Sequence, residues 1–255
     1  MTPETAFDYF FGKDSISAVE TRPEGQIIGS TLLVHGLGGN KNSETHLAAV
    51  ERLSEMGVAT LRFDFPGHGE SSGTTEELTI SQGAALVNKL TDELAERFSG
   101  KPIALLGASY GGSCILASQV SAKAAAIVLR SPVSDYQAVR AHQLGPDGLA
   151  RWEKEGVIDG LISRGRLTPW AFYIDAGRID LYAKAANERA PLLLVHGNKD
   201  TTVPVAQSER LCSAWGGKTD LRQIAGGDHS LSDTTHTRMF VDLACSWIAD
   251  HLGDH

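Results

Sequence analysis

Short apolar runs recur along this chain, each ending at glycine or at small polar residues, and amphipathic stretches separate them. Such alternation is typical of strand–helix units, which build a mainly parallel sheet. We therefore expect an α/β fold with one central sheet flanked by helices. The expected strands are 16–19, which we place at the edge of the sheet, 27–34, 59–63, 103–106, 124–129, 192–195 and 221–224.

Helices are expected between these strands. Residues 80–98 show the pattern most clearly, because Leu86, Leu90 and Leu94 recur on one face of a helix. Gly57 marks the end of another helix, since glycine readily adopts the left-handed conformation that closes a helix. The expected helices are 47–56, 80–98, 110–120, 205–215 and 238–252.

Residues 133–189 break this alternation. The segment has no strong strand pattern, and glycines and prolines interrupt it repeatedly. A stretch this long between two core strands is too long for a bare loop. We expect it to form an inserted, mostly helical cap, while residues 1–132 and 190–255 form an α/β core. Aromatic residues gather in the expected cap: Tyr136, Trp152, Trp170, Phe172, Tyr173 and Tyr182.

Length and charge narrow the class of protein. The chain has 255 residues, which suits one large domain. Its formal net charge is −8 and it has no dense Lys/Arg cluster, so no nucleic-acid partner is expected. It contains no apolar run of about 18 residues, and its first residues do not resemble a signal peptide. We therefore expect a cytoplasmic protein with no membrane partner, and a homodimer stays open.

Cysteine and motif patterns bear on metals and cofactors. Cys114, Cys212 and Cys245 lie far apart and are odd in number, which argues for reduced thiols. Neither an HExxH nor a CxxC pattern is present, and no G-x-G-x-x-G sequence follows a strand. We therefore expect no metal site and no cofactor.

A G-x-S-x-G motif runs from Gly107 to Gly111, between the expected strand 103–106 and the expected helix 110–120. A nucleophile elbow requires this strand–turn–helix order, and its glycines let the strand and the helix pass close together. The helix N-terminus also favours negative charge at the reacting centre. The motif nominates Ser109 as a nucleophile; the alternative is a glycine-rich turn with an incidental serine.

A serine hydroxyl needs an adjacent base, and the base needs a group that fixes its tautomer. After a nucleophile elbow, the acid and then the histidine follow along the chain. Asp200 follows the expected strand 192–195, and His229 follows 221–224. Catalytic groups collect at the carboxyl ends of strands in open α/β sheets. We therefore expect Ser109 as nucleophile, His229 as general base and Asp200 as the acid that orients the histidine.

Other polar residues near strand ends have structural interpretations. Asp228 is a rival acid, but it directly precedes His229 and would not readily reach around to Nδ1. His35 and His196 each end a strand, and His68 lies in a turn-rich loop. We expect these three histidines to hold loops in place.

Acyl transfer also needs hydrogen-bond donors for the oxyanion. The backbone N–H of Tyr110, directly after the nucleophile, is one candidate. The second should come from the loop after an early strand, and residues 35–40 form such a loop. We choose the Leu37 N–H; the alternative is that these glycines only make a flexible turn.

Five segments together, HGLGGN, RFDFPGHGESSG, GASYGG, HGNKDTTVP and GGDHSL, span nearly the whole chain. They resemble the α/β-hydrolase superfamily, and within it the small bacterial esterases that include the cinnamoyl and feruloyl esterases. The resemblance implies the triad Ser109, Asp200 and His229. It also implies that Tyr173 helps to hold an aromatic acyl group. We expect the aromatic residues of the cap, Trp170 among them, to form an apolar substrate wall; the alternative is that they form a small hydrophobic core of the cap itself.

These features predict a serine esterase that hydrolyses a small-molecule ester, with a cinnamoyl-type acyl group as one candidate. A thioesterase or peptidase would share the triad and the acyl-enzyme, so both remain alternatives. A non-catalytic binding protein is a further alternative, although such a protein would be expected to have lost a triad member. Dehalogenases and epoxide hydrolases are disfavoured, because they place an aspartate where Ser109 stands.

Overall fold

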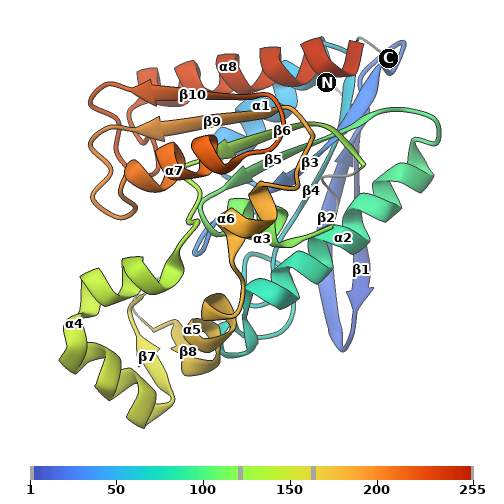
Figure 1. Cartoon of the computed structure of the whole chain (residues 1–255). Coiled ribbons are helices and arrows are strands. Elements are labelled where there is room, and N and C mark those ends of the chain that lie inside the picture. Colours follow the sequence, from blue (N-terminus) through green and yellow to red (C-terminus); the bar gives the residue numbers. More distant parts are fainter. Residues whose placement is uncertain (1–2, 120–122, 162–164, 254–255) are drawn as a thin grey trace.

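A computed structural model describes residues 3–119, 123–161 and 165–253. A single eight-stranded sheet runs through the molecule, in the order β1-β2-β4-β3-β5-β6-β9-β10 (Figure 1). The strands from β4 to β10 pair in parallel, whereas β2 pairs antiparallel with β1 and β4. The strands are β1 (Glu4–Phe11), β2 (Asp14–Thr21), β3 (Gly29–Val34), β4 (Val58–Phe63), β5 (Ile103–Ala108), β6 (Ala124–Arg130), β9 (Leu192–Gly197) and β10 (Thr219–Ile224).

The edge of the sheet differs from the sequence prediction. Residues 16–19 were expected at the edge, but they belong to β2, which pairs on both sides. The edge strand is β1, which the prediction missed. Its outward residues are exposed, while Phe7, Tyr9 and Phe11 pack partly buried on the core. Asp8 and the largely exposed Phe10 stand between these residues, so the sequence alternation that could have indicated the strand is imperfect.

Helices cover both faces of the sheet. Helices α1 (Glu44–Glu55) and α8 (Thr234–Gly253) pack on one face, and α2 (Ile80–Arg97), α3 (Tyr110–Ala117) and α7 (Ala206–Ala214) on the other (Figure 1). The end of the expected helix 110–120 falls on residue 120, which lies outside the described residues.

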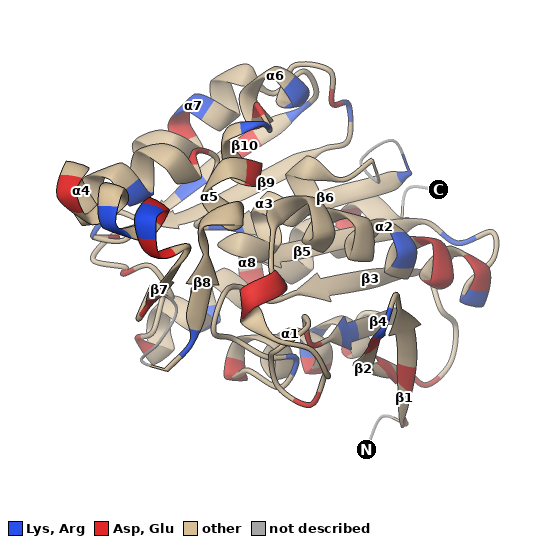
Figure 2. Ribbon diagram, turned by 90° about the horizontal axis from the view of Figure 1, so that it is seen from below, with Lys and Arg blue, Asp and Glu red and all other residues tan. Residues whose placement is uncertain are grey.

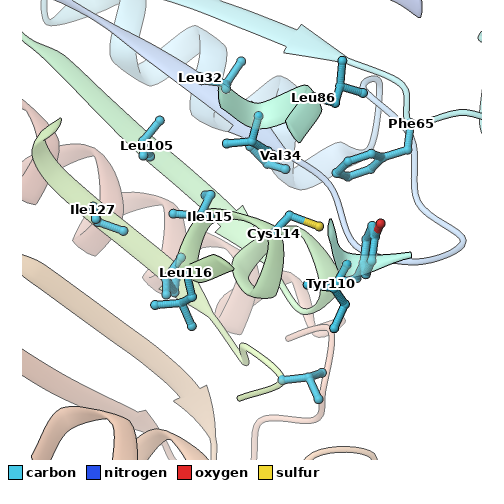
Figure 3. Packing of buried hydrophobic residues seen from close by; sticks show 14 of the residues in the cluster. Leu32, Val34, Phe65, Leu86, Leu105, Tyr110, Cys114, Ile115, Leu116 and Ile127 are labelled. Carbon is cyan, nitrogen blue, oxygen red and sulfur yellow. The ribbon is translucent and has the colours of Figure 1, made fainter. Parts of the chain in front are cut away.

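The strands are apolar on both faces because both faces are covered. Figure 3 shows one side of this core, where Leu105 and Ile127 of the sheet meet Ile115 of α3. All three side chains are essentially inaccessible to solvent. Burial of such side chains against the sheet holds β5 and α3 in place, and Ser109 lies at their junction.

The segment between β6 and β9 forms elements outside the eight-stranded sheet, which we call the insertion (residues 136–185) and which share one hydrophobic core with it. Helix α4 is broken at Gly145, whose φ of 64° and ψ of 178° are not helical, directly before Pro146. A two-stranded antiparallel ladder follows, although the sequence showed no strand there. Its three-residue strands are too short to leave a periodic pattern. The elements are α4 (Tyr136–Glu155), β7 (Val157–Asp159), β8 (Leu167–Pro169), α5 (Trp170–Gly177) and α6 (Leu181–Ala185).

Charged residues of both signs are interspersed along the surface helices, as α2 and α4 show in Figure 2. Within the described ranges, no helix is both long enough and apolar enough to cross a lipid bilayer.

Candidate active site

Ser109 occupies the sharp turn between β5 and α3. Its φ of 49° and ψ of −115° are unusual for a residue with a side chain and store backbone strain. The Ser109 N–H donates to the Arg130 carbonyl at 2.9 Å, which ties the turn to β6. A Cβ at Gly111 would collide with the carbonyl oxygens of Val34 and His35. Glycine is therefore required there for α3 to approach the sheet.

The structure brings Ser109, His229 and Asp200 together from three loops. The His229 Nε2 lies 3.0 Å from the Ser109 Oγ, and its Nδ1 lies 2.7 Å from the Asp200 Oδ2. A carboxylate can only accept, so the Nδ1–H donates to Asp200 and Nε2 is left to accept the serine hydroxyl proton. This is the tautomer in which a histidine serves as a base toward a hydroxyl.

Asp200 is fully buried and held by hydrogen bonds on both carboxylate oxygens. Its Oδ1 accepts from the N–H groups of Thr202 and Val203, each at 2.8 Å. Burial by itself would raise the pKa of Asp200, but the hydrogen bonds from His196 and His229 more than offset it and hold this pKa well below its usual range. Asp200 is therefore a carboxylate throughout the neutral pH range.

Asp228, the rival acid, points elsewhere. Its Oδ1 accepts from the Ser232 N–H at 2.8 Å, and its Oδ2 accepts from the Ser232 hydroxyl. The side chain closes the turn that leads into α8, and Asp200 is the carboxylate that His229 contacts.

His196 contacts the same carboxylate, which the sequence analysis did not predict. Its Nε2 lies 3.0 Å from both the Asp200 Oδ2 and the Val203 carbonyl oxygen. Both neighbours accept, so Nε2 carries a proton and donates to them. Its Nδ1 lies 2.8 Å from the Ser208 hydroxyl on α7. The side chain is completely buried, so it holds a loop as expected and also positions Asp200.

The two residues expected to donate to the oxyanion, Tyr110 and Leu37, lie near Ser109, the first beside it in the chain and the second in the same cavities. Tyr110 is the first residue of α3, so its N–H has no partner within the helix. Its phenol is buried and points away, donating to the Thr79 carbonyl at 2.7 Å. Leu37 lines both cavities that contain Ser109.

Two histidines brace the loop that carries Leu37. The Gly38 N–H donates to the His68 Nε2 at 3.1 Å, and the Phe65 N–H donates to the His35 Nε2 at 3.0 Å. Both rings must be neutral at Nε2 to accept. Burial, together with the neighbouring His68, lowers the pKa of His35 to about 4, which keeps it neutral at ordinary pH.

Ser109 and His229 border two cavities, one on each side. One, of about 250 Å³, lies between the loop 35–39, Arg130 and Ser230. The other, of about 410 Å³, is lined in part by the insertion. An ester has an acyl and an alcohol portion, and each cavity is large enough for one small portion. The insertion contributes Tyr136, one of the cap aromatics expected in a substrate wall, and five residues that the sequence analysis did not single out for this role: Val139, Arg140, Gln143, Gly160 and Leu161.

Trp170 and Tyr173, two of the aromatic residues expected in a substrate wall, pack on each other inside the insertion. Their ring centroids lie 4.6 Å apart, and both pack against the buried Trp152. Neither is among the residues that line the two cavities at Ser109. Tyr136 is the aromatic residue that does, and it packs edge-on against Phe172 at 5.0 Å.

The described part of the chain offers no cluster of side chains for binding a metal ion. Among the described residues, no group of three or more His, Cys, Asp or Glu side chains is arranged to hold an ion. The site consists of a hydroxyl, an imidazole and a carboxylate joined in that order by hydrogen bonds.

Known proteins resemble this chain over most of its length. Residues 31–243 match the model of the alpha/beta hydrolase family. The monoacylglycerol lipase of Mycolicibacterium smegmatis is 26% identical, with 91% of each chain covered. The palmitoyl-protein thioesterase ABHD10 of Mus musculus is 24% identical over 82% of this chain and 72% of its own. Est1E from Butyrivibrio proteoclasticus, solved with bound ferulic acid, superposes with a TM-score of 0.82 at 22% identity, covering 96% of this chain and 100% of its own. The chain belongs to the alpha/beta hydrolase family.

Proposed function

We propose that this protein is a serine carboxylesterase that hydrolyses small esters through an acyl-enzyme. One observation carries the proposal: the unbroken hydrogen-bonded series from the Ser109 Oγ through the His229 ring to the Asp200 Oδ2, with separations of 3.0 and 2.7 Å. Its relatives include a lipase and thioesterases, which also cleave acyl groups from an oxygen or a sulfur.

The geometry supports a two-step reaction. Ser109 attacks the ester carbonyl carbon while the His229 Nε2 takes the hydroxyl proton. Asp200 stabilises the resulting imidazolium, and the N–H groups of Leu37 and Tyr110 bind the oxyanion. His229 then protonates the departing alkoxide, which releases the alcohol. In the second step His229 activates water, which attacks the acyl-enzyme, and the acid leaves as Ser109 regains its proton.

The acyl group is proposed to enter the larger cavity, beside the insertion. Its lining includes the apolar side chains of Val133, Val139 and Leu161 and the ring of Tyr136. A cinnamoyl-type acyl group is one candidate occupant, since the related Est1E has ferulic acid bound. Contact of Trp170 and Tyr173 with substrate stays a prediction. Because the two rings stack within the insertion, the role we propose for them is indirect, through support of the cavity wall.

Labelling with a fluorophosphonate tests the nucleophile. The protein should be labelled and Ser109→Ala should not, while Ser213→Ala, on an exposed part of α7, serves as the matched control. Labelling of Ser109→Ala at the rate of the unaltered protein would overturn the assignment. Absence of any labelling or turnover would instead favour a binding protein on this fold.

Substrate class needs a separate measurement. Nitrophenyl esters of increasing acyl length, a methyl cinnamate series, an acyl-CoA and an aminoacyl amide should be compared by kcat/KM. We expect the esters to be cleaved fastest. Faster cleavage of the thioester would assign the protein to the thioesterases, with the same three side chains in the same roles.

A further inference from the structure

Arg140, on the first half of α4, is a buried cation without an acidic partner. Only 6% of the residue is exposed. Its Nη1 donates to the Gln143 side chain at 2.7 Å, and its guanidinium lies 5.6 Å from the centre of the Tyr136 ring. Its Nε is buried and has no hydrogen-bond partner. Among the described residues, no aspartate or glutamate pairs with it.

Burying the Arg140 guanidinium in this way costs free energy when no ligand is bound. A guanidinium has five N–H donors and stays protonated at neutral pH. A buried charge is normally paired or fully hydrogen-bonded, because it has lost its hydration. The amide of Gln143 and the face of Tyr136 are neutral, so they compensate only part of that loss.

Arg140 lines the larger cavity at Ser109. Arg140, Gln143, Ser109 and His229 all line the same space of about 410 Å³. No acidic residue is among the described residues that line it. The chain as a whole is acidic, with a formal net charge of −8, so this positive charge is a local feature of the cavity.

We propose that Arg140 is a specificity-determining residue that binds an anionic group of the substrate, a carboxylate carried on the ester to be hydrolysed. This inference rests on the proposed esterase function and narrows its substrate class. The planar guanidinium suits a carboxylate, to which it donates two parallel hydrogen bonds. Gln143 holds the guanidinium from one side and leaves other donors free for the ligand.

The other residues that line the cavity indicate the chemistry of the part of the substrate between the carboxylate and the ester. Val139, Leu161 and Val203 are apolar and share the cavity with Ser109. The expected substrate is therefore a short apolar or aromatic ester with a carboxylate at the end remote from the scissile bond.

Matched pairs of substrates test the proposal. On the acyl side, 4-nitrophenyl hydrogen adipate is compared with its methyl ester; on the alcohol side, 4-acetoxybenzoate is compared with 4-acetoxybenzamide. The unaltered protein should prefer the anionic member of at least one pair. In Arg140→Met, kcat/KM for that member should fall about 10- to 100-fold, mainly through KM, as expected for loss of a charge-assisted contact. The neutral member should change by less than about threefold, because uniform loss would indicate a general defect.

Further variants separate charge from packing. Arg140→Lys keeps the charge and should retain part of the preference, although it loses the paired donors. Arg151→Met, at an exposed position of the same helix, should behave like the unaltered protein. A measurement without any variant gives a second test: benzoate should inhibit more strongly than benzamide.

Two results would overturn the proposal: an equal fall for both members of each pair in Arg140→Met, or no preference for the anionic member together with equal inhibition by benzoate and benzamide. If hydrolysis of the anionic and the neutral esters alike depended on Ser109 but not on Arg140, this inference would fail and the esterase function would stand. If no ester were turned over and Ser109 were not labelled, the proposed function itself would fail.

Discussion

His196 and Asp200 are joined by a buried hydrogen bond of 3.0 Å, between the Nε2 of the histidine and the Oδ2 of the carboxylate. The same oxygen accepts from the His229 Nδ1 at 2.7 Å. Asp200 is therefore held between two imidazoles, one of which faces Ser109 while the other is anchored on Ser208 of α7. The position of the Asp200 carboxylate therefore depends on its hydrogen bonds with both His196 and His229.

Replacing His196 should impair catalysis although the residue does not border Ser109. In His196→Leu, Asp200 loses one donor, so its pKa should rise toward the usual range and its orientation of His229 should weaken. We expect kcat to fall about 10- to 100-fold, by analogy with groups that orient metal-bound histidines, with KM little changed. His196→Gln retains a donor and should recover part of the rate. Equal losses in both variants, with an unaltered pH profile, would indicate damage to the fold alone.

Removing the charge of Asp200 should affect the reaction far more than removing that of Asp228. Asp200→Asn allows the wrong tautomer of His229, and losses of about 10⁴-fold in kcat are known for the equivalent change in a serine protease. Asp228→Asn is the matched control, because Asp228 bonds only with the turn before α8. Turnover of a nitrophenyl ester checks both. A larger loss in Asp228→Asn would mean that the acid has been misassigned.

Acid should destabilise the fold through two buried histidines. Burial lowers the pKa of His35 to about 4 and that of His46 to about 3, from an ordinary value of 6.5. Below pH 6.5 the unfolded chain binds protons that the folded protein does not, so the free energy of unfolding falls until about pH 4 for the His35 contribution and about pH 3 for the His46 contribution. Each histidine contributes at most about 1.4 kcal/mol per pH unit.

Urea unfolding between pH 7.5 and 4 measures this slope. His46→Leu should flatten the slope, because it removes one of the two titrating groups. The buried His46 Nδ1 has no hydrogen-bond partner, so the substitution breaks no bond at that atom. His142→Gln, at an exposed position, is the control and should keep the slope of the unaltered protein. An unchanged slope in His46→Leu would exclude His46 as a source of the acid sensitivity.

Gly111→Ala should destabilise the elbow. The added Cβ would overlap the carbonyl oxygens of Val34 and His35, and backbone atoms cannot move aside cheaply. We expect a loss of about 1–3 kcal/mol in the free energy of unfolding, typical of overpacking, and slower fluorophosphonate labelling of Ser109. Gly253→Ala, where a Cβ meets nothing, should leave both measurements unchanged. Equal stability of the two variants would contradict the close packing of α3 on β3.

Much of the architecture could be predicted from local patterns. The parallel strands β3, β4, β5 and β9 are buried along their whole length and mainly apolar, so each appears as a compact run ending at a loop. The insertion could be recognised by its glycines and aromatics, but not its ladder β7–β8 or the break at Gly145. The edge strand β1 was missed because half of its residues face solvent and its partner strand begins just beyond a tight turn at Gly12.

The site divides in the same way. The sequence alone nominates Ser109, Asp200 and His229, because each residue type follows a strand in the order this chemistry uses. Whether their side chains meet depends on the packing of the sheet. The contact of His196 with Asp200 and the position of the unpaired Arg140 at the cavity depend on tertiary packing in the same way. Residue type and spacing are local properties of the chain, whereas burial and the partners of a charged group are set by segments far apart in sequence, so only the tertiary structure could decide them.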